Sequence, residues 1–272
     1  MKAAAFEYEK PADVAAAVKL LSGSEGMGKV IAGGQSLGPM LNLRLAQPQL
    51  LVDVRGIEEM RAVTESADAL TIGACTTHAA IEDGRLPDVT RGLLPSVAAD
   101  IAYRAVRNRG TLGGSLAHAD PAADWVNTLC LLDAVAILQG PAGRREVRVT
   151  EFMQGPFATA LAEDELLVAV RVAKLSKSAR WGYYKFCRKT GEFAEAIGAV
   201  LLDPERKLCR ALVGATNSTP HVVADARGFA ERFDPAAAMQ AVEDAGLGED
   251  AYERQMHFAA LRRAVARTGA HA

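Results

Sequence analysis

The sequence lacks several features that would point to familiar classes of protein. No run of residues approaches the roughly 20 apolar positions that a membrane-spanning helix requires. The charge is nearly balanced, with 31 Lys and Arg against 33 Asp and Glu, so no overall field would attract nucleic acid or an anionic membrane. We therefore expect no nucleic-acid partner and no membrane span, and a role with a small molecule gains weight.

Metal-binding patterns are absent as well. The cysteines are widely separated and form no Cys-x-x-Cys pair: Cys75, Cys130, Cys187 and Cys209. Cysteines at such positions do not match the spacing of a structural zinc site or of a [2Fe–2S] cluster, and the histidines do not have the spacing of metal ligands. Charged residues interrupt the apolar character of the N-terminal segment, which therefore does not read as a signal peptide. We expect no metal in this chain, and a cytoplasmic location.

Two common nucleotide-binding motifs can be set aside. Residues 23–30, "GSEGMGKV", have the GxxxxGK spacing of a P-loop, but Val30 stands where Ser or Thr must bind Mg²⁺. The segment also precedes its strand, whereas a P-loop follows one. No GxGxxG follows a strand and opens a helix, so a Rossmann domain is not supported. A dinucleotide, if one is bound, requires another fold.

Half of the 272 residues are apolar, which is enough for one large domain or two ordinary ones.

Residues 1–54 predict a small β-α-β unit. Its helix has Pro11 in the first turn, carries apolar residues at helical spacing and stops at Gly23. The strands are "KVIAG" (29–33) and "QPQLLVDV" (47–54).

The middle of the chain predicts further strands and two helices. The strands are "ALTIGAC" (69–75), "AVAILQG" (134–140) and "ELLVAVRV" (165–172). One helix covers 91–106, and a second starts from Asp120 as N-cap and Pro121 as first helical residue and runs to Leu132.

A polar, Lys- and Ser-rich linker follows residue 173. Beyond it the sequence predicts an antiparallel sheet of three strands, "RWGYYKFCRKT", "AIGAVLLD" and "LCRALVGAT". Helices at about 222–232, 235–246 and 249–268 complete the chain. The fold class is therefore α+β, with a first domain over 1–173, made of subdomains at about 1–54 and 55–173, and a C-terminal domain over 178–272.

Two glycine loops share one design. "VIAGGQSLGPMLNLR" begins at Val30 and "RGTLGGSLAHADPAADW" at Arg109, and in each a Gly pair is followed by a serine and an apolar run. A Gly-Gly step lets backbone N–H groups approach an anion, and the serine adds a hydroxyl donor at the start of a helix. Two converging loops could hold both phosphates of a dinucleotide; the alternative is that each is only a tight turn.

The ordered pair of motifs resembles the FAD-binding medium subunit of the molybdenum hydroxylases, the family of the carbon monoxide, xanthine and nicotine dehydrogenase types. The similarity extends over the whole chain. It implies an FAD domain of the para-cresol methylhydroxylase type, built from two subdomains, followed by a small C-terminal domain. It also implies noncovalent FAD, with the molybdenum cofactor and [2Fe–2S] clusters only on partner subunits.

The resemblance places ten residues at the diphosphate of FAD: Ala32, Gly33, Gly34, Gln35 and Ser36 in the first loop, and Thr111, Leu112, Gly113, Gly114 and Ser115 in the second. Asp124 matches an acidic residue that contacts the cofactor beyond the diphosphate, although a carboxylate in the first turn of a helix is also favoured by the helix dipole. Many relatives have proline shortly after this aspartate, whereas Trp125 and Val126 stand here, so the sequence departs from the family pattern on the adenosine side.

Three more residues correspond to positions at the flavin end. Leu167 matches a main-chain contact, although a plain core leucine would look the same. Lys185 matches a lysine near the isoalloxazine ring, where its charge would stabilise the anion of the reduced flavin; the alternative is a solvated strand lysine. Phe193 would pack against the ring or belong to the core. His118 suggests a covalent attachment point, but its place beside the diphosphate favours an ordinary polar residue.

The resemblance implies an electron-transfer subunit with no catalytic residue for the substrate. It would take electrons from [2Fe–2S] clusters on a small partner subunit, within a dimer of heterotrimers that also contains a large molybdenum subunit, and pass them to an external acceptor. Two alternatives stay open: a self-contained flavin oxidase, and a noncatalytic nucleotide-binding assembly protein. The substrate of the complex and the acceptor cannot be read from this chain.

Overall fold

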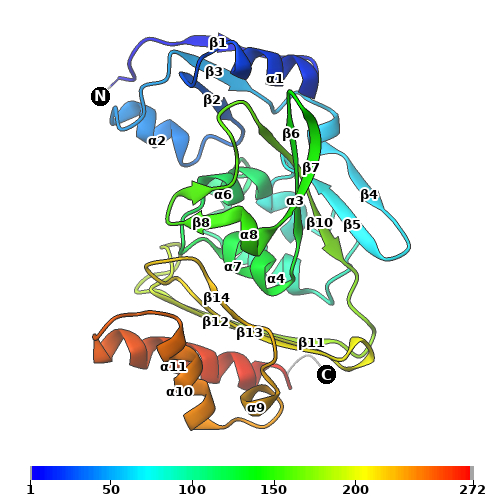
Figure 1. Cartoon of the computed structure of the whole chain (residues 1–272), viewed down its shortest axis with the longest axis vertical. Helices are drawn as coiled ribbons and strands as arrows, with labels where there is room; N and C mark the ends of the chain where they lie inside the picture. Colours follow the sequence, from blue (N-terminus) through cyan, green and yellow to red (C-terminus); the bar gives the residue numbers. More distant parts are fainter. Residues whose placement is uncertain (1, 270–272) are drawn as a thin grey trace.

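The computed structural model describes residues 2–269, and its first unit is a small parallel sheet (Figure 1). The strands are β1 (Glu7–Glu9), β2 (Gly28–Ile31) and β3 (Leu50–Asp53), in the order β1-β3-β2 with parallel pairing. The helices α1 (Val14–Ser22) and α2 (Leu37–Asn42) connect them. The predicted β-α-β unit is present, with one additional strand at its N-terminal edge.

Helix α1 shows why its sequence signals worked. Asp13 is the N-cap, and its Oδ1 accepts a hydrogen bond from the backbone N–H of Ala16 at 2.8 Å. The apolar positions at helical spacing face the core and are buried, and Gly23 ends the helix. Pro11 therefore lies before the helix and not in its first turn.

The second unit contains an antiparallel sheet of five strands in the order β4-β5-β10-β6-β7. Its strands are β4 (Val63–Glu65), β5 (Ala69–Gly73), β6 (Val135–Gly140), β7 (Gly143–Arg148) and β10 (Leu166–Ala173). A short 3₁₀ helix, η1 (Glu59–Arg61), leads into it, and a two-stranded ribbon, β8 (Met153–Gly155) with β9 (Ala158–Thr159), lies beside it. The three predicted strands of this region all belong to the sheet.

Six short helices accompany this sheet: α3 (His78–Glu82), α4 (Leu93–Ala99), α5 (Arg104–Arg107), α6 (Leu112–His118), α7 (Asp124–Leu131) and α8 (Val149–Phe152). The helix predicted over 91–106 is in fact two, because the chain leaves the helical path at Asp100 and Ala102 has φ of +43°. Helix α7 begins later than predicted. The side chain of Asp120 caps a turn by accepting from Ala122 N–H at 2.9 Å, and the helix starts at Asp124.

The third unit is an antiparallel sheet with a helical layer. Its strands are β11 (Arg180–Phe186), β12 (Ala196–Asp203), β13 (Leu208–Gly214) and β14 (His221–Val223), in chain order. The sequence predicted three strands, and β14 is the fourth. The remaining elements are the 3₁₀ helix η2 (Pro204–Arg206) and the helices α9 (Arg227–Ala230), α10 (Pro235–Asp244) and α11 (Ala251–Arg267).

Both faces of the third sheet are covered. Along β12, Ile197 and Leu201 belong to the core shared with the second unit, whereas Val200 and Leu202 pack under the C-terminal helices. Figure 1 shows α7 on one side of this sheet and α11 on the other. This double burial explains why the segment "AIGAVLLD" is apolar throughout. Among residues 2–269, no helix is long and apolar enough to cross a membrane.

Candidate cofactor-binding site

The two glycine loops meet through their backbones. A Cβ atom at Gly33 would lie 2.1 Å from the carbonyl oxygen of Arg109 and 2.8 Å from Cα of Gly110. On the other side of the junction, a Cβ atom at Gly114 would lie 3.8 Å from Cβ of Ala32. Only a glycine at position 33 permits this approach. The structure therefore brings the two motifs together, as the dinucleotide hypothesis requires.

The first loop has unused hydrogen-bond donors. Gly34 has φ of +72°, a conformation that favours glycine. Within the described chain, the backbone N–H groups from Gly33 to Ser36 donate to no protein acceptor. The hydroxyl of Ser36 is free of protein partners as well in this part of the structure. Since α2 has only six residues, these local donors, and not a long helix dipole, are what the loop offers to an anion.

The second loop is different, because most of its N–H groups already bond within the protein. The bonds are Leu112 N to Thr76 O (2.9 Å), Gly113 N to Ala74 O (2.9 Å), Gly114 N to Thr111 Oγ1 (3.1 Å) and Ser115 N to Thr111 O (3.0 Å). Gly114 is exposed, and Ser115 Oγ has no partner among the described residues. The second loop is thus held in place by its own hydrogen bonds, and it offers a ligand the exposed backbone of Gly114 and the hydroxyl of Ser115.

A histidine that was not predicted supports the second loop. His78 is 5% exposed, and its Nδ1 accepts a hydrogen bond from Trp125 Nε1 at 2.9 Å. Its Nε2 would lie 2.6 Å from a Cβ atom at Gly110. Burial, assisted by the charge of Arg107, lowers the pKa of His78 to about 4, so the ring is neutral at pH 7. No role for His78 was predicted from the sequence, because a single histidine in an apolar segment belongs to no recognisable motif.

Asp124 and Lys185 form a buried ion pair with each other. Lys185 Nζ lies 3.0 Å from Asp124 Oδ2 and donates a second bond to the carbonyl oxygen of Asp100 at 2.7 Å. The Tyr183 hydroxyl donates to Asp124 Oδ1 at 2.8 Å. Burial raises the pKa of Asp124, and the Lys185 ammonium and the Tyr183 hydroxyl oppose that rise. The idea that Lys185 is a solvated strand lysine is wrong, since its side chain is 9% exposed.

The other two predicted residues of the flavin end differ in exposure. Leu167 lies in the core, at the start of a bulge in β10. Phe193 is 62% exposed in the connection between β11 and β12, which excludes the core alternative. Tyr103 holds this connection: its hydroxyl donates to Thr190 O at 2.9 Å, and a Cβ atom at Gly191 would lie 2.6 Å from its ring. His118 packs its ring against Phe157, with centroids 5.3 Å apart.

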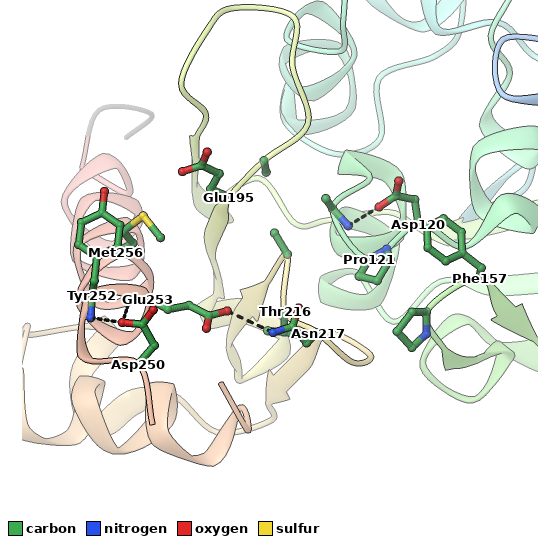
Figure 2. Close-up of a pocket in the computed structure, with 14 residues that line it drawn as sticks. Asp120, Pro121, Phe157, Glu195, Thr216, Asn217, Asp250, Tyr252, Glu253 and Met256 are labelled. Carbon is green, nitrogen blue, oxygen red and sulfur yellow. Dashed lines mark hydrogen bonds between the residues drawn. The ribbon is translucent and has the colours of Figure 1, made fainter. Parts of the chain in front are cut away.

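A cavity of about 530 Å³ opens between the second and third units (Figure 2). Its lining includes four carboxylates, Asp120, Glu195, Asp250 and Glu253, but no Lys, Arg or His. None of the predicted site residues lines it. Among residues 2–269, no group of three or more His, Cys, Asp or Glu side chains could hold a metal ion.

A family comparison decides what the glycine loops belong to. Residues 4–174 match the model of the FAD binding domain in molybdopterin dehydrogenase. The chain belongs to this FAD-binding family. FAD is accordingly its cofactor, and the chain is the flavoprotein component of an oxidoreductase.

The similarity between this FAD-binding chain and its relatives extends over nearly its whole length. It is 35% identical to the carbon monoxide dehydrogenase medium chain of Hydrogenophaga pseudoflava, covering 88% of this chain and 84% of the relative. It is 34% identical to the nicotine 6-hydroxylase medium subunit of Paenarthrobacter nicotinovorans, covering 99% of both. Among solved structures, it is similar to a carbon monoxide dehydrogenase of Hydrogenophaga pseudoflava that lacks the Mo-pyranopterin moiety, with TM-score 0.86, 31% identity and coverage of 100% and 99%. Quinoline 2-oxidoreductase of Pseudomonas putida 86 gives TM-score 0.85 and 32% identity, covering 99% of both chains.

The geometry fits a diphosphate. The junction at Gly33 leaves no space for a side chain, and the first loop offers free N–H groups. Each loop also carries one unpartnered hydroxyl, Ser36 in the first and Ser115 in the second. Because no basic side chain lies within either loop motif from 32 to 36 or from 111 to 115, neutral donors would carry the recognition. Direct contact of each predicted residue with FAD stays a prediction.

Proposed function

We propose that this chain is the electron-transfer subunit of a molybdenum-containing hydroxylase or dehydrogenase. The junction of the two glycine loops at Gly33 supports this proposal most directly, because it brings together the two distant segments that we assign to the diphosphate of FAD. In this role the chain receives electrons from [2Fe–2S] clusters on a partner subunit and passes them to an external acceptor. Relatives that are medium chains or medium subunits of such enzymes support it.

We propose partners of two kinds, a small iron–sulfur subunit and a large molybdenum subunit, assembled as a dimer of heterotrimers. Substrate oxidation would then take place on the large subunit. The names of the relatives support an assembly with further chains, since a medium chain implies chains of other sizes. The cytoplasmic location expected from the sequence stays a prediction.

We assign the residues to two ends of the cofactor. Residues 32–36 and 111–115 hold the diphosphate, through the free N–H groups of the first loop and the hydroxyls of Ser36 and Ser115. Leu167, Lys185 and Phe193 belong to the flavin end. Asp124 contacts the cofactor beyond the diphosphate and pairs with Lys185. When bound, FAD stores two electrons and can release them singly. We also keep the boundaries 1–173 for the FAD-binding domain, with subdomains at about 1–54 and 55–173, and 178–272 for the C-terminal domain.

The test is affinity purification of the tagged chain from its native host, with identification of co-purifying chains and a visible spectrum of the product. We expect bound FAD, two further subunits and iron–sulfur absorbance. FAD in a protein that purifies alone and oxidises a small substrate would support the flavin oxidase instead. Co-purifying chains without any flavin would support the assembly protein.

A further inference from the structure

The Asp124 carboxylate is shared by two donors from one strand. Tyr183 and Lys185 are two positions apart in β11, so both point to the same face, toward α7. Tyr184 lies between them on the opposite face, where Arg263 and Arg267 contact its ring. The neighbouring tyrosine therefore provides a matched control, with the same side chain on the same strand but outside the cluster.

Burial makes the protonation state of this cluster important. Asp124 is 7% exposed and Tyr183 5%, so charges here are weakly screened. The groups that face the carboxylate are the Lys185 ammonium and Tyr183 hydroxyl of β11, and Asp100 after α4, whose negative charge opposes ionisation. Thr128 of α7 lies beside the Tyr183 hydroxyl. Burial and the nearby Asp124 charge hold the pKa of Tyr183 well above its usual value, so Tyr183 remains a donor across the working pH range.

We propose that Tyr183 is a positioning residue that keeps Asp124 ionised against Lys185 and so controls how much of the Lys185 charge reaches a bound flavin. A hydrogen bond to the ionised form favours that form. Without the Tyr183 hydroxyl, Asp124 takes up a proton at higher pH. The Lys185 charge then loses its counter-charge and stabilises the negative charge of the reduced flavin more strongly. This inference rests on the proposed placement of Lys185 at the flavin end.

The first experiment follows Asp124 without using the flavin. Infrared titration of the full chain records the carboxylic acid C=O band, and Asp124→Asn identifies it by its loss. Because a hydrogen bond to a charged group is lost, we expect Tyr183→Phe to move the protonation to higher pH by about one pH unit. Tyr184→Phe should leave it unchanged. Equal titrations in Tyr183→Phe and wild type overturn the proposal.

The second experiment measures the flavin potential against pH, by dye-coupled titration at matched FAD occupancy. The rise in potential on acidification should begin about one pH unit higher in Tyr183→Phe, and at its wild-type position in Tyr184→Phe. A shifted infrared band with an unchanged potential curve overturns the link to the flavin. If the protein retains no FAD, the proposed function fails, while the infrared titration still decides the effect of Tyr183 on Asp124.

A third variant protects the test against poor folding of Tyr183→Phe. Incorporating 3,5-difluorotyrosine at position 183 keeps the shape and makes the hydroxyl a stronger donor. The Asp124 band should then titrate at lower pH than in wild type, which is the opposite direction. An upward shift, or none, contradicts the proposal.

Discussion

Gly33 packs directly against the carbonyl group of Arg109, so the two glycine motifs meet through their backbones. A motif can need glycine for two reasons, a positive φ or a close approach of its backbone to another group, and this contact distinguishes them. Gly34 has a positive φ, but Gly33 and Gly114 do not. A positive φ is therefore not the reason for glycine at either of these two positions, and the requirement at Gly33 is close approach.

We expect Gly33→Ala alone to abolish FAD retention. Its methyl group would lie 2.1 Å from Arg109 O, so the second loop must move away from the first. Flavin content after gel filtration is the measurement. Gly38→Ala is the control, because a Cβ atom there meets nothing within 4 Å and alanine favours a helix by about 1 kcal/mol over glycine. Wild-type flavin content in Gly33→Ala would remove this contact from the site.

Gly114→Val should lose FAD while keeping most of the fold. Gly114 is exposed, and the first atom that a Cβ would meet is Thr111 Oγ1, at 2.7 Å. The valine therefore covers the loop surface and disturbs the helix cap, but it does not enter the core. Circular dichroism should stay close to wild type. Normal flavin binding would show that the second loop does not face the cofactor.

The bound FAD should be noncovalent. His118, the one residue considered for attachment, packs against Phe157, and we expect acid precipitation to release the yellow colour into the supernatant. Flavin that remained with the pellet would contradict this expectation. Release of FMN alone would argue against a diphosphate site.

Lys185→Met should lower the two-electron potential of the flavin. Loss of about 1 to 3 kcal/mol of charge-assisted interaction corresponds to roughly 20 to 65 mV. The fold should also lose about 3 to 5 kcal/mol of stability, since a buried carboxylate is left unpaired. Asp124→Asn should raise the potential, because the Lys185 charge becomes uncompensated. The double variant should lie nearer to wild type in both properties. An unchanged potential with strongly reduced FAD occupancy would show that Lys185 is an anchor.

Stability should depend on the protonation of His78. Its folded pKa is about 4, below the ordinary value of 6.5, so the unfolded chain binds the proton more tightly. The contribution of neutral His78 to the free energy of unfolding is complete above pH 6.5. It is lost as the pH falls toward 4, and the total loss is about 3 kcal/mol. Urea unfolding between pH 7 and pH 4.5 measures it. His78→Gln should flatten this dependence, and an equal slope in both proteins would exclude His78 as its source.

The sequence predicted the elements with strong periodicity and missed those without it. The strands of the five-stranded and four-stranded sheets that carry long apolar runs were found. Helix α6 was missed because its first turn contains the Gly-Gly pair that reads as a loop, and β14 because a three-residue strand has no measurable alternation. The helix predicted over 91–106 breaks where Ala102 adopts positive φ, a tertiary effect that local propensity does not contain.

The site was predictable as a pair of motifs but not as a set of contacts. Glycine and serine at fixed spacing indicated two phosphate loops. That the first loop keeps free donors while the second has bonded most of its own depends on β5 and the segment after it, which supply Ala74 and Thr76 as acceptors. The pairing of Lys185 with Asp124 likewise arises only when β11 packs against α7. Such contacts leave no trace in local sequence.

Helix α7 is buried along its whole length, and its first two residues bond to different units of the structure. Asp124 binds the third sheet through Lys185 and Tyr183, while Trp125 binds His78 beneath the second glycine loop. A rigid helix cannot change one set of contacts without straining the other. Filling the cofactor site should therefore hold the second and third units together through α7. The 174–179 linker, which connects these two units, should then become more resistant to proteases, although it lies outside the predicted site.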